Sequence, residues 1–322
     1  MSDYYIVSDV GGTRMRVAVF EVGSIAPSRH EVISTHSPGQ TPLKRLLELI
    51  IKIQPTGGKL RAIAVAAPAV LDPRTGFIYD ATNVQGWVNI PLADILTSEF
   101  NAPALVGNDA NLAALGEWRF GAGKGHHDLI YLTVSTGIGG GVIMDDRLLL
   151  GSRGLATELG HITVEHEGPV CGCGQRGHLE AVASGPAMVN WVLEQRRNGV
   201  DSILPLQPVP TARDISWAAG QGDSLSREAL VRTGRYVGRA VADFLHIFNP
   251  SIVIIGGGVS FSGPLFWDTL LQTARSSVMT PAYLDGLVIT HAALGDDVGL
   301  MGAYTLASMT YPVELTEKRL DG

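Results

Sequence analysis

Short apolar runs and one clear amphipathic stripe mark the first part of the chain. Leucine and isoleucine recur at positions i, i+3, i+4 and i+7 in residues 43–53, which predicts a helix, and Thr41 and Pro42 mark its start. Four short runs, two of them on either side of a Gly-Gly turn, predict β-strands at 4–10, 14–22, 61–67 and 104–107. A hairpin followed by alternating helices and strands is typical of an α/β layer.

The same order of elements returns in the second part of the chain. A strand is predicted at 128–135, and a glycine-rich turn and a second strand follow it. A long helix is predicted at 226–248, ended by Asn249-Pro250, and SIVIIGGGVS is then typical of a buried strand that runs into three glycines. Each half therefore opens with strand, glycine turn and strand, which indicates a weak duplication of architecture without sequence identity.

Composition narrows the class of protein. The chain has 322 residues, 45% of them hydrophobic, and a formal net charge of -7, so it can bury a large core as two domains and offers no clustered basic surface for nucleic acid. No apolar run approaches the roughly 20 residues of a membrane-spanning helix, and the start lacks the features of a signal peptide. Cys171 and Cys173 are the two cysteines, too few for a disulfide framework. We therefore expect a cytoplasmic globular protein that binds neither membrane nor nucleic acid.

Three glycine-rich turns carry the first hint of chemistry, at 9–13 (DVGGT), 135–141 (STGIGGG) and 256–258 (GGG). Any one of them alone is best explained as a hairpin closure, because glycine permits positive φ. Backbone without side chains also lets N–H groups approach phosphate oxygens. The Walker motif does not occur in the chain, and the single GxGxxG match, GCGQRG at 172–177, lies in the cysteine segment and does not follow a predicted strand. Two phosphate-type loops at the heads of two similar halves therefore predict a nucleotide held between the halves.

Five segments, in this order and spacing, carry a resemblance to a known family: DVGGTRMR, NDAN, STGIGGG, ATELGH and CGCGQRGHLE. Together they resemble the ROK family of bacterial sugar kinases and related repressors, over nearly the whole chain. The resemblance implies the actin-like, hexokinase-type ATPase fold, an α/β fold whose two domains hold sugar and ATP in the cleft between them. We place a smaller domain at 1–118 plus 298–322 and a larger one at 119–297.

The resemblance also implies how ATP and Mg²⁺ are held. The implied contacts come from all three turns: Asp9 near the magnesium ion; Gly11, Gly12 and Thr13 on the phosphates; Thr136 and Gly137 on the phosphates from the other side; and Gly256, Gly257 and Gly258 along the adenosine. One position departs from the family pattern. Pro68-Ala69 stands where the family usually has Pro-Gly, which bears on the backbone contacts to the sugar.

Asp109 follows a predicted strand and precedes a predicted helix, so it has two interpretations. As an N-cap it would accept hydrogen bonds from the helix start. As a catalytic base it would accept the proton of the sugar hydroxyl that attacks the γ-phosphate. Beside two phosphate loops we favour the base, and the two roles are compatible. The resemblance implies these sugar ligands: Asn83, Asn108, Asp109, Glu158, His161 and Glu180. The competing interpretation of the two glutamates is a solvated surface charge.

The sequence Cys171-Gly172-Cys173 lies between His161 and His178. Two sulfur and two nitrogen ligands suit tetrahedral Zn²⁺, and the family usually has a third cysteine where this chain has His178. Three alternatives stay open: His166 as a rival fourth ligand, a pair of buried thiols, and a Cys-Gly-Cys disulfide, which a reducing cell disfavours. We expect a structural zinc that holds the loop carrying His161 and Glu180 against the sugar.

These features predict transfer of the γ-phosphate of MgATP to the 6-hydroxyl of a hexose, with glucose the first candidate. N-acetylglucosamine, N-acetylmannosamine, fructose and allose stay open as substrates. A sugar-responsive transcriptional repressor is the alternative of another class, but the first phosphate loop starts at Asp9, which leaves no room before it for a DNA-reading domain. An actin-like ATPase or chaperone would not need the sugar ligands and cysteines. The resemblance suggests a homodimer or homotetramer.

Overall fold

The computed structural model of the chain describes residues 2–81 and 83–313, which form two compact units. The first contains residues 2–81 and 83–121, the segment Leu150–Ala156 and residues 294–313; the second contains Ala122–Leu149 and Thr157–Ala293. The sequence placed Leu150–Ala156 in the larger domain, whereas in the structure this segment packs on the first unit, with Gly154 against Pro73. Residues 314–322, assigned above to the smaller domain, lie outside the described residues.

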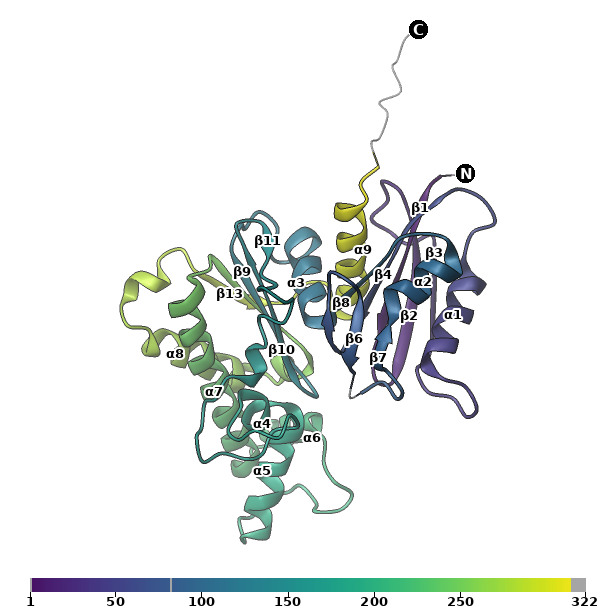
Figure 1. The fold of residues 1–322 in the computed structure, drawn as a ribbon. Helices are drawn as coiled ribbons and strands as arrows, with labels where there is room; N and C mark the ends of the chain where they lie inside the picture. The colour runs from purple at the N-terminus through teal and green to yellow at the C-terminus, as the bar shows by residue number, and fades with distance from the viewer. Residues whose placement is uncertain (1, 82, 314–322) are drawn as a thin grey trace. The chain divides into compact units, whose positions relative to one another are not determined.

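A five-stranded sheet in the order β3-β2-β1-β4-β8 forms the first unit's centre (Figure 1). Its strands are β1 (Tyr4–Val10), β2 (Arg14–Glu21), β3 (Arg29–Ser34), β4 (Leu60–Ala67) and β8 (Ala104–Asn108). β1 and β2 pair antiparallel as the predicted hairpin, while β4 and β8 run parallel to β1. The strands predicted for the first half are therefore confirmed, and three parallel strands end at one edge of the sheet.

Helices cover this sheet. They are α1 (Pro42–Ile53), α2 (Leu92–Phe100), α3 (Asp109–Phe120) and α9 (Val298–Thr310), and a small sheet of β5 (Val70–Asp72), β6 (Phe77–Asp80) and β7 (Val88–Pro91) adjoins them. The predicted start of α1 is confirmed, because the Thr41 side chain accepts a hydrogen bond from the backbone N–H of Lys44. α3 packs on α9 so closely that Gly302 has no room for a side chain beside Leu112.

The second unit repeats the topology of the first. Its sheet has the order β11-β10-β9-β12-β13, with strands β9 (Leu129–Val134), β10 (Ile138–Met144), β11 (Arg147–Leu148), β12 (Ile252–Gly256) and β13 (Val288–His291). Again a hairpin, β9–β10, is extended by two strands parallel to its first strand. The expected duplication is confirmed in strand order. The turn is shorter than expected, because the glycines at 139–141 already belong to β10.

A mainly helical layer completes the second unit. It contains α4 (Leu179–Ala183), α5 (Gly185–Arg197), α6 (Ala212–Gly220), α7 (Ser224–Phe248) and α8 (Pro264–Ser277), with short 3-10 turns η1 (Leu159–His161), η2 (Gly258–Phe261) and η3 (Pro281–Leu284). A further 3-10 turn, η4 (Gly295–Asp297), precedes α9 in the first unit. Across residues 2–81 and 83–313, none of the helices combines the length and apolar character needed to cross a membrane.

Candidate active site

The first glycine turn joins β1 to β2 and lies against a predicted sugar ligand. The backbone N–H of Gly11 donates to the carbonyl of Arg14 at 2.9 Å, which closes the turn. Gly12 contacts Asn83 so closely that a Cβ on Gly12 would lie 3.1 Å from the carbonyl oxygen of Asn83. The turn expected to bind phosphate and Asn83, which is expected to bind the sugar, are therefore adjacent within the first unit.

Asp9, at the end of β1, already has a cationic partner. Arg16 Nη2 lies 2.6 Å from Asp9 Oδ2, and Gly299 at the start of α9 approaches the carboxyl group from another side. Burial raises the pKa of the Asp9 carboxyl and the charge of Asp296 adds to this, while Arg16 lowers it. The effect of Arg16 offsets that of burial only in part, so the pKa of Asp9 stays above its usual value, and a magnesium ion bound at Asp9 would share the carboxylate with this guanidinium.

Asp109 stands at the junction of β8 and α3, and the neighbouring residue provides the helix cap. Asn108 Oδ1 accepts hydrogen bonds from the backbone N–H groups of Ala110 (3.0 Å) and Asn111 (3.1 Å), so Asn108 is the N-cap. The cap interpretation of Asp109 is thus corrected: it is the first helical residue, half-buried, and its Oδ1 accepts from Ala110 N at 2.8 Å.

The departure at Ala69 causes no backbone strain. Asn108 Nδ2 donates to the carbonyl of Ala69 at 3.3 Å, so this backbone supports the residue beside Asp109. Ala69 does not have a positive φ, the one conformation in which a glycine would be required. A Cβ at this position is therefore compatible with the loop, and the sequence-level concern about the contacts there has no conformational basis.

Glu180 approaches the second glycine turn, 42 residues away in the chain. Its Oε2 accepts from the backbone N–H of Ile138 at 2.9 Å, and a Cβ on Gly137 would lie 2.6 Å from the same oxygen. The turn itself is closed by the N–H of Ser135, which donates to the carbonyl of Gly137 at 2.8 Å. Gly137 therefore leaves room for the Glu180 carboxylate as well as for any phosphate, and Glu180 is not a solvated surface charge.

Glu158 immediately precedes the short turn η1, and His161 is the last residue of that turn. The backbone N–H of His161 donates to the carbonyl of Glu158 at 3.0 Å, and the preceding Thr157 adopts φ 70°, which is rare for a β-branched residue. Burial raises the pKa of Glu158, His161 opposes this and Glu180 adds to it. Much of the Glu158 surface is exposed, so the desolvation comes from the protein groups packed around part of its carboxylate; within the second unit the two carboxylates and the imidazole interact electrostatically.

Gly160 sets the position of this turn and offers a stability test. A Cβ at Gly160 would overlap the carbonyl oxygen of Ile138 on β10, whereas a Cβ at Gly172 would meet nothing within 4 Å. We expect Gly160→Ala to lower the free energy of unfolding by at least about 2 kcal/mol, because the backbone must move to relieve the overlap. Gly172→Ala is the matched control and should change it by less than about 0.5 kcal/mol. Urea unfolding of both variants measures the difference, and equal stabilities would contradict the close packing of this turn.

The four residues predicted as metal ligands lie together. One ligand atom from each of His161, Cys171, Cys173 and His178 lies within 4.8 Å of all the others. The Nδ1 atoms of the two histidines are 3.3 Å apart, Cys171 Sγ is 3.6 Å from His161 Nδ1, and Cys173 Sγ is 3.2 Å from His178 Nδ1. His166 is exposed and lies outside this cluster, so the structure removes it as the rival ligand.

Two of these separations, 3.3 Å between the imidazoles and 3.6 Å from Cys171 to His161, match the edges of a tetrahedral zinc site, and the 3.2 Å from Cys173 to His178 is shorter than such an edge. With Zn–N of about 2.0–2.1 Å and Zn–S of about 2.3 Å, a tetrahedron has N···N edges of about 3.3–3.4 Å and N···S edges of about 3.5–3.6 Å. Burial raises the pKa of the Cys171 thiol to about 11, so the metal-free thiol is protonated at neutral pH. A divalent cation would supply the positive charge that favours the thiolate. The donor set therefore suits zinc, and Cys173 would have to move by a few tenths of an ångström to complete the tetrahedron.

The loop that carries these ligands is tied to the central helix α7. Arg232 on α7 donates to the carbonyl of Val182 at 2.8 Å, stacks over the Tyr236 ring and lies 3.6 Å from the carboxylate of Glu165. Tyr236 donates its phenol to the same carboxylate at 2.8 Å. Because Glu165 belongs to the ligand loop and Val182 to the helix that bears Glu180, this network couples both to the buried core.

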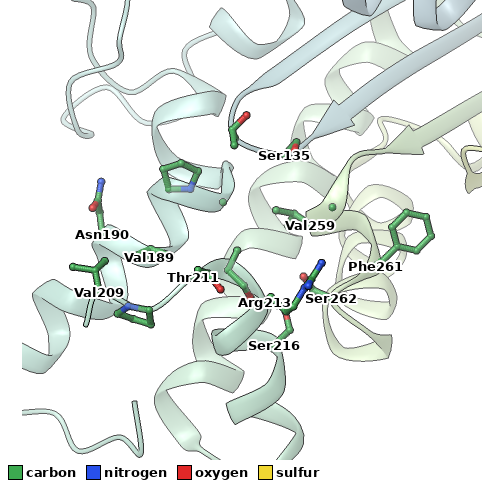
Figure 2. Close-up of a pocket in the computed structure, with 16 residues that line it drawn as sticks. Ser135, Val189, Asn190, Val209, Thr211, Arg213, Ser216, Val259, Phe261 and Ser262 are labelled. Atoms are coloured by element: carbon green, nitrogen blue, oxygen red, sulfur yellow. Dashed lines mark hydrogen bonds between the residues drawn. The ribbon is translucent and has the colours of Figure 1, made fainter. Parts of the chain in front are cut away.

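A pocket of about 850 Å³ lies beside the second and third glycine turns (Figure 2). Its volume is within the roughly 300–1,000 Å³ usual for small-molecule sites. Sixteen residues line it: Ser135, Thr136, Gly185, Pro186, Val189, Asn190, Val209, Pro210, Thr211, Ala212, Arg213, Ser216, Gly258, Val259, Phe261 and Ser262. Of the residues expected at the nucleotide, Thr136 and Gly258 therefore share one pocket.

Most of this lining was missed by the sequence reasoning. Gly256 is buried in β12 and Gly257 packs on the carbonyl of Val134, so neither lines the pocket. The pocket-lining residues on α5 and α6 form no recognisable motif. Their mixture of apolar and polar residues is that of any amphipathic helix. Only Thr211, with Asp214 three residues later, gave a local signal, and that signal marks a helix start.

Comparison with known proteins relates this architecture to characterised ones. The glucokinase of Thermotoga maritima is 35% identical over 303 residues, which cover 92% of this chain and 95% of that protein. A xylose repressor from Caldicellulosiruptor bescii is 37% identical over 231 residues, 70% of this chain and 58% of the repressor. The crystal structure of a ROK family glucokinase from Streptomyces griseus in complex with glucose and AMPPNP matches with a TM-score of 0.79 at 31% identity, covering 95% of this chain and 99% of that one.

These similarities confirm the predicted hexokinase-type α/β fold. The sequence profile of the ROK family matches residues 5–310, which include every motif on which the resemblance rested. Two sheets of identical strand order, each opening with a glycine turn, agree with that match. The chain is a member of the ROK family.

Proposed function

We propose that this protein is an ATP-dependent hexose kinase that transfers the γ-phosphate to the 6-hydroxyl of glucose. The observation that carries the proposal is topological: two glycine turns occupy the same position in two sheets of identical strand order. The second turn also opens into the 850 Å³ pocket. The glucokinases among its relatives support glucose as the acceptor, because they match nearly the whole chain.

The two turns have complementary tasks in this proposal. The backbone N–H of Gly12 and the hydroxyl of Thr13 bind phosphate oxygens, as do Gly137 and the hydroxyl of Thr136. Gly11 supports this contact by closing the turn, because its own N–H donates to the carbonyl of Arg14. The adenosine occupies the pocket beside Gly258, where apolar residues form the walls. Mg²⁺ near Asp9 supplies charge neutralisation on the β- and γ-phosphates when bound.

Asp109 acts as the catalytic base for the sugar hydroxyl that accepts the phosphoryl group. The 6-hydroxyl oxygen of the sugar forms a bond to the γ-phosphorus, the bond from that phosphorus to the bridging oxygen of ADP breaks, and the hydroxyl proton moves to the Asp109 carboxylate. Asn83 and Asn108 in the first unit, and Glu158, His161 and Glu180 in the second, provide the hydrogen-bonding groups that a sugar's hydroxyls need in a dry site. Their proposed role is to orient the sugar, not to take its proton.

A structural zinc ion belongs to this proposal. His161, Cys171, Cys173 and His178 would hold it; their donor chemistry suits the ion, and two of the three separations described above match a tetrahedral site. Its task would be to keep the loop of His161 in place, next to the helix that carries Glu180. With two thiolates and two neutral imidazoles the occupied site has no net charge, whereas three thiolates would give -1, so we expect weaker attraction for the cation than in a three-cysteine site.

A sugar panel tests the function directly. The purified chain is incubated with ATP, Mg²⁺ and each of glucose, N-acetylglucosamine, N-acetylmannosamine, fructose and allose, and ADP release is measured together with the sugar phosphate formed. We expect the highest kcat/KM with glucose. Phosphorylation of another sugar in preference to glucose would correct the substrate, and binding of sugar without ADP release in any reaction would favour the repressor function that one relative represents.

Thr136 allows a test of the second phosphate turn without disturbing Glu180. We expect Thr136→Ala to raise the KM for ATP by about 10-fold or more, because a hydroxyl bonded to a charged phosphate contributes roughly 1.5–3 kcal/mol. Thr136→Ser keeps the hydroxyl and should keep most of the affinity. Initial rates at varied ATP and saturating sugar give the comparison. A rise in the KM for sugar alone would remove Thr136 from the phosphate site.

A further inference from the structure

One cation faces the pocket beside the second glycine turn. Arg213, the second residue of α6, is the single charged residue among the sixteen that line it. Val189, Val209 and Val259 form apolar walls around the same space (Figure 2). Arg213 is exposed, so its side chain can move over a ligand held between these walls, and it is the one group there that can offer a positive charge to the ligand.

Arg213 has no ion pair or hydrogen bond among the described residues that would neutralise it. The adjacent carboxylate of Asp214 is engaged elsewhere, since its Oδ2 accepts from the N–H and the hydroxyl of Thr211, each at 2.7 Å. The N–H of Asp214 in turn donates to the Thr211 hydroxyl at 3.2 Å. This capping box is formed by Thr211 and Asp214 and does not use the Arg213 side chain, which is left for contacts across the pocket.

The two ends of the pocket differ in the part of a nucleotide that they could bind. Ser135, next to the phosphate turn, lies at one end in Figure 2, and Arg213 and Ser216 lie at the other. At the α6 end the helix start carries the negative charge of Asp214, and the N–H groups of Thr211 and Asp214 are bonded within the capping box, which disfavours phosphate there. The apolar walls between the two ends suit a flat, uncharged ring.

We propose that Arg213 determines the specificity for the phosphoryl donor by placing its guanidinium over the purine base of ATP. A planar guanidinium stacks on an aromatic ring through the ring's π face, and the contact strengthens where water is excluded. The proposal rests on the kinase function above, since it assumes ATP as the donor. It adds that the chain recognises the base and does not rely on the phosphates alone.

The test separates base from phosphate with two partial ligands. Calorimetry on the full chain measures the affinity for adenosine, which has the base alone, for inorganic tripolyphosphate, which has the phosphates alone, and for the non-hydrolysable ATP analogue AMPPNP. The variants are Arg213→Ala, Arg213→Lys, which keeps the charge without the plane, and Arg239→Ala as control. Arg239 is exposed on α7 and does not line the pocket.

We expect Arg213→Ala to lower the affinity for adenosine and for AMPPNP by about 3- to 30-fold. The affinity for tripolyphosphate should stay within about twofold of the wild-type value. The affinity of Arg213→Lys for adenosine should lie between those of Arg213→Ala and the wild type, and Arg239→Ala should match the wild type for all three ligands. Equal losses for tripolyphosphate and AMPPNP would assign Arg213 to phosphate and overturn the inference, as would unchanged adenosine affinity. If the wild type binds adenosine but phosphorylates no sugar, the kinase function fails while the variants still decide the base contact.

Discussion

Asp109→Asn should lower kcat by about 10²–10⁴-fold and change the KM for sugar much less, the largest effect we expect from any single substitution. Asparagine keeps the size of the side chain and an oxygen that can accept from Ala110 N, the contact that Asp109 Oδ1 makes at 2.8 Å. It cannot take the proton of the attacking hydroxyl. Because Asn108 caps α3 by itself, the helix start should survive the change.

Asp94→Asn provides a matched control for Asp109→Asn. Asp94 is an exposed carboxylate in the first turn of α2, a helix that likewise belongs to the first unit, and no catalytic role is assigned to it. Its variant should keep wild-type turnover. Steady-state kinetics and thermal melting of both proteins separate a chemical effect from a folding effect. Near-normal turnover of Asp109→Asn, with wild-type stability, would remove Asp109 from the mechanism.

Cys171→Ser should abolish stoichiometric zinc binding, with a loss of affinity of at least about 100-fold, because even changes outside the ligand set often cost 10- to 100-fold. The wild type should contain one zinc ion per chain by elemental analysis of protein purified without a histidine tag. Loss of the ion should loosen the loop of His161 and raise the KM for sugar before the protein unfolds. Acid should favour release, since protons compete with zinc for both imidazoles.

His166→Ala is the control for the metal site. His166 lies five residues from Cys171 in sequence but outside the four-residue cluster, so its removal should leave zinc content unchanged. A chelator should strip zinc from the wild type and from His166→Ala at the same rate. The absence of zinc from wild-type protein, combined with full activity in chelator, would show that His178 marks a degenerate site and that the four residues have another use.

Features that depend on near neighbours were predictable from the sequence. Helix α1 and its Thr41 cap, the two hairpins and the strand-end position of Asp109 follow from periodicity and turn residues within a few positions of one another. The duplication was also visible, because each hairpin is a local pattern that occurs twice. The metal cluster was predictable for the same reason: its two cysteines and His178 lie within eight consecutive residues.

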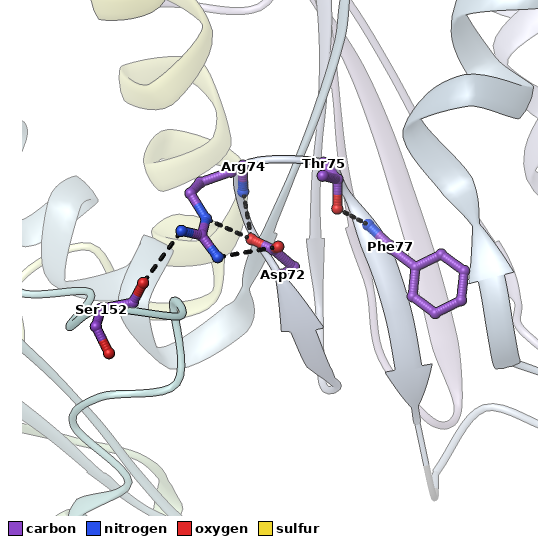
Figure 3. Close-up of polar contacts among 5 residues, drawn as sticks. All are labelled: Asp72, Arg74, Thr75, Phe77 and Ser152. Atoms are coloured by element: carbon purple, nitrogen blue, oxygen red, sulfur yellow. Dashed lines mark hydrogen bonds and ion pairs between the residues drawn. The ribbon is translucent and has the colours of Figure 1, made fainter.

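Contacts between distant segments were decided only by the tertiary structure. Arg74 pairs with Asp72 and also donates to the carbonyl of Ser152 at 3.1 Å, which fixes Leu150–Ala156 to the first unit although its chain neighbours belong to the second (Figure 3). The approach of Glu180 to Ile138 and the position of Arg213 at the pocket are of the same kind. Periodicity shows which face of a segment is apolar but not which distant segment covers it, because that choice depends on the packing of the whole core.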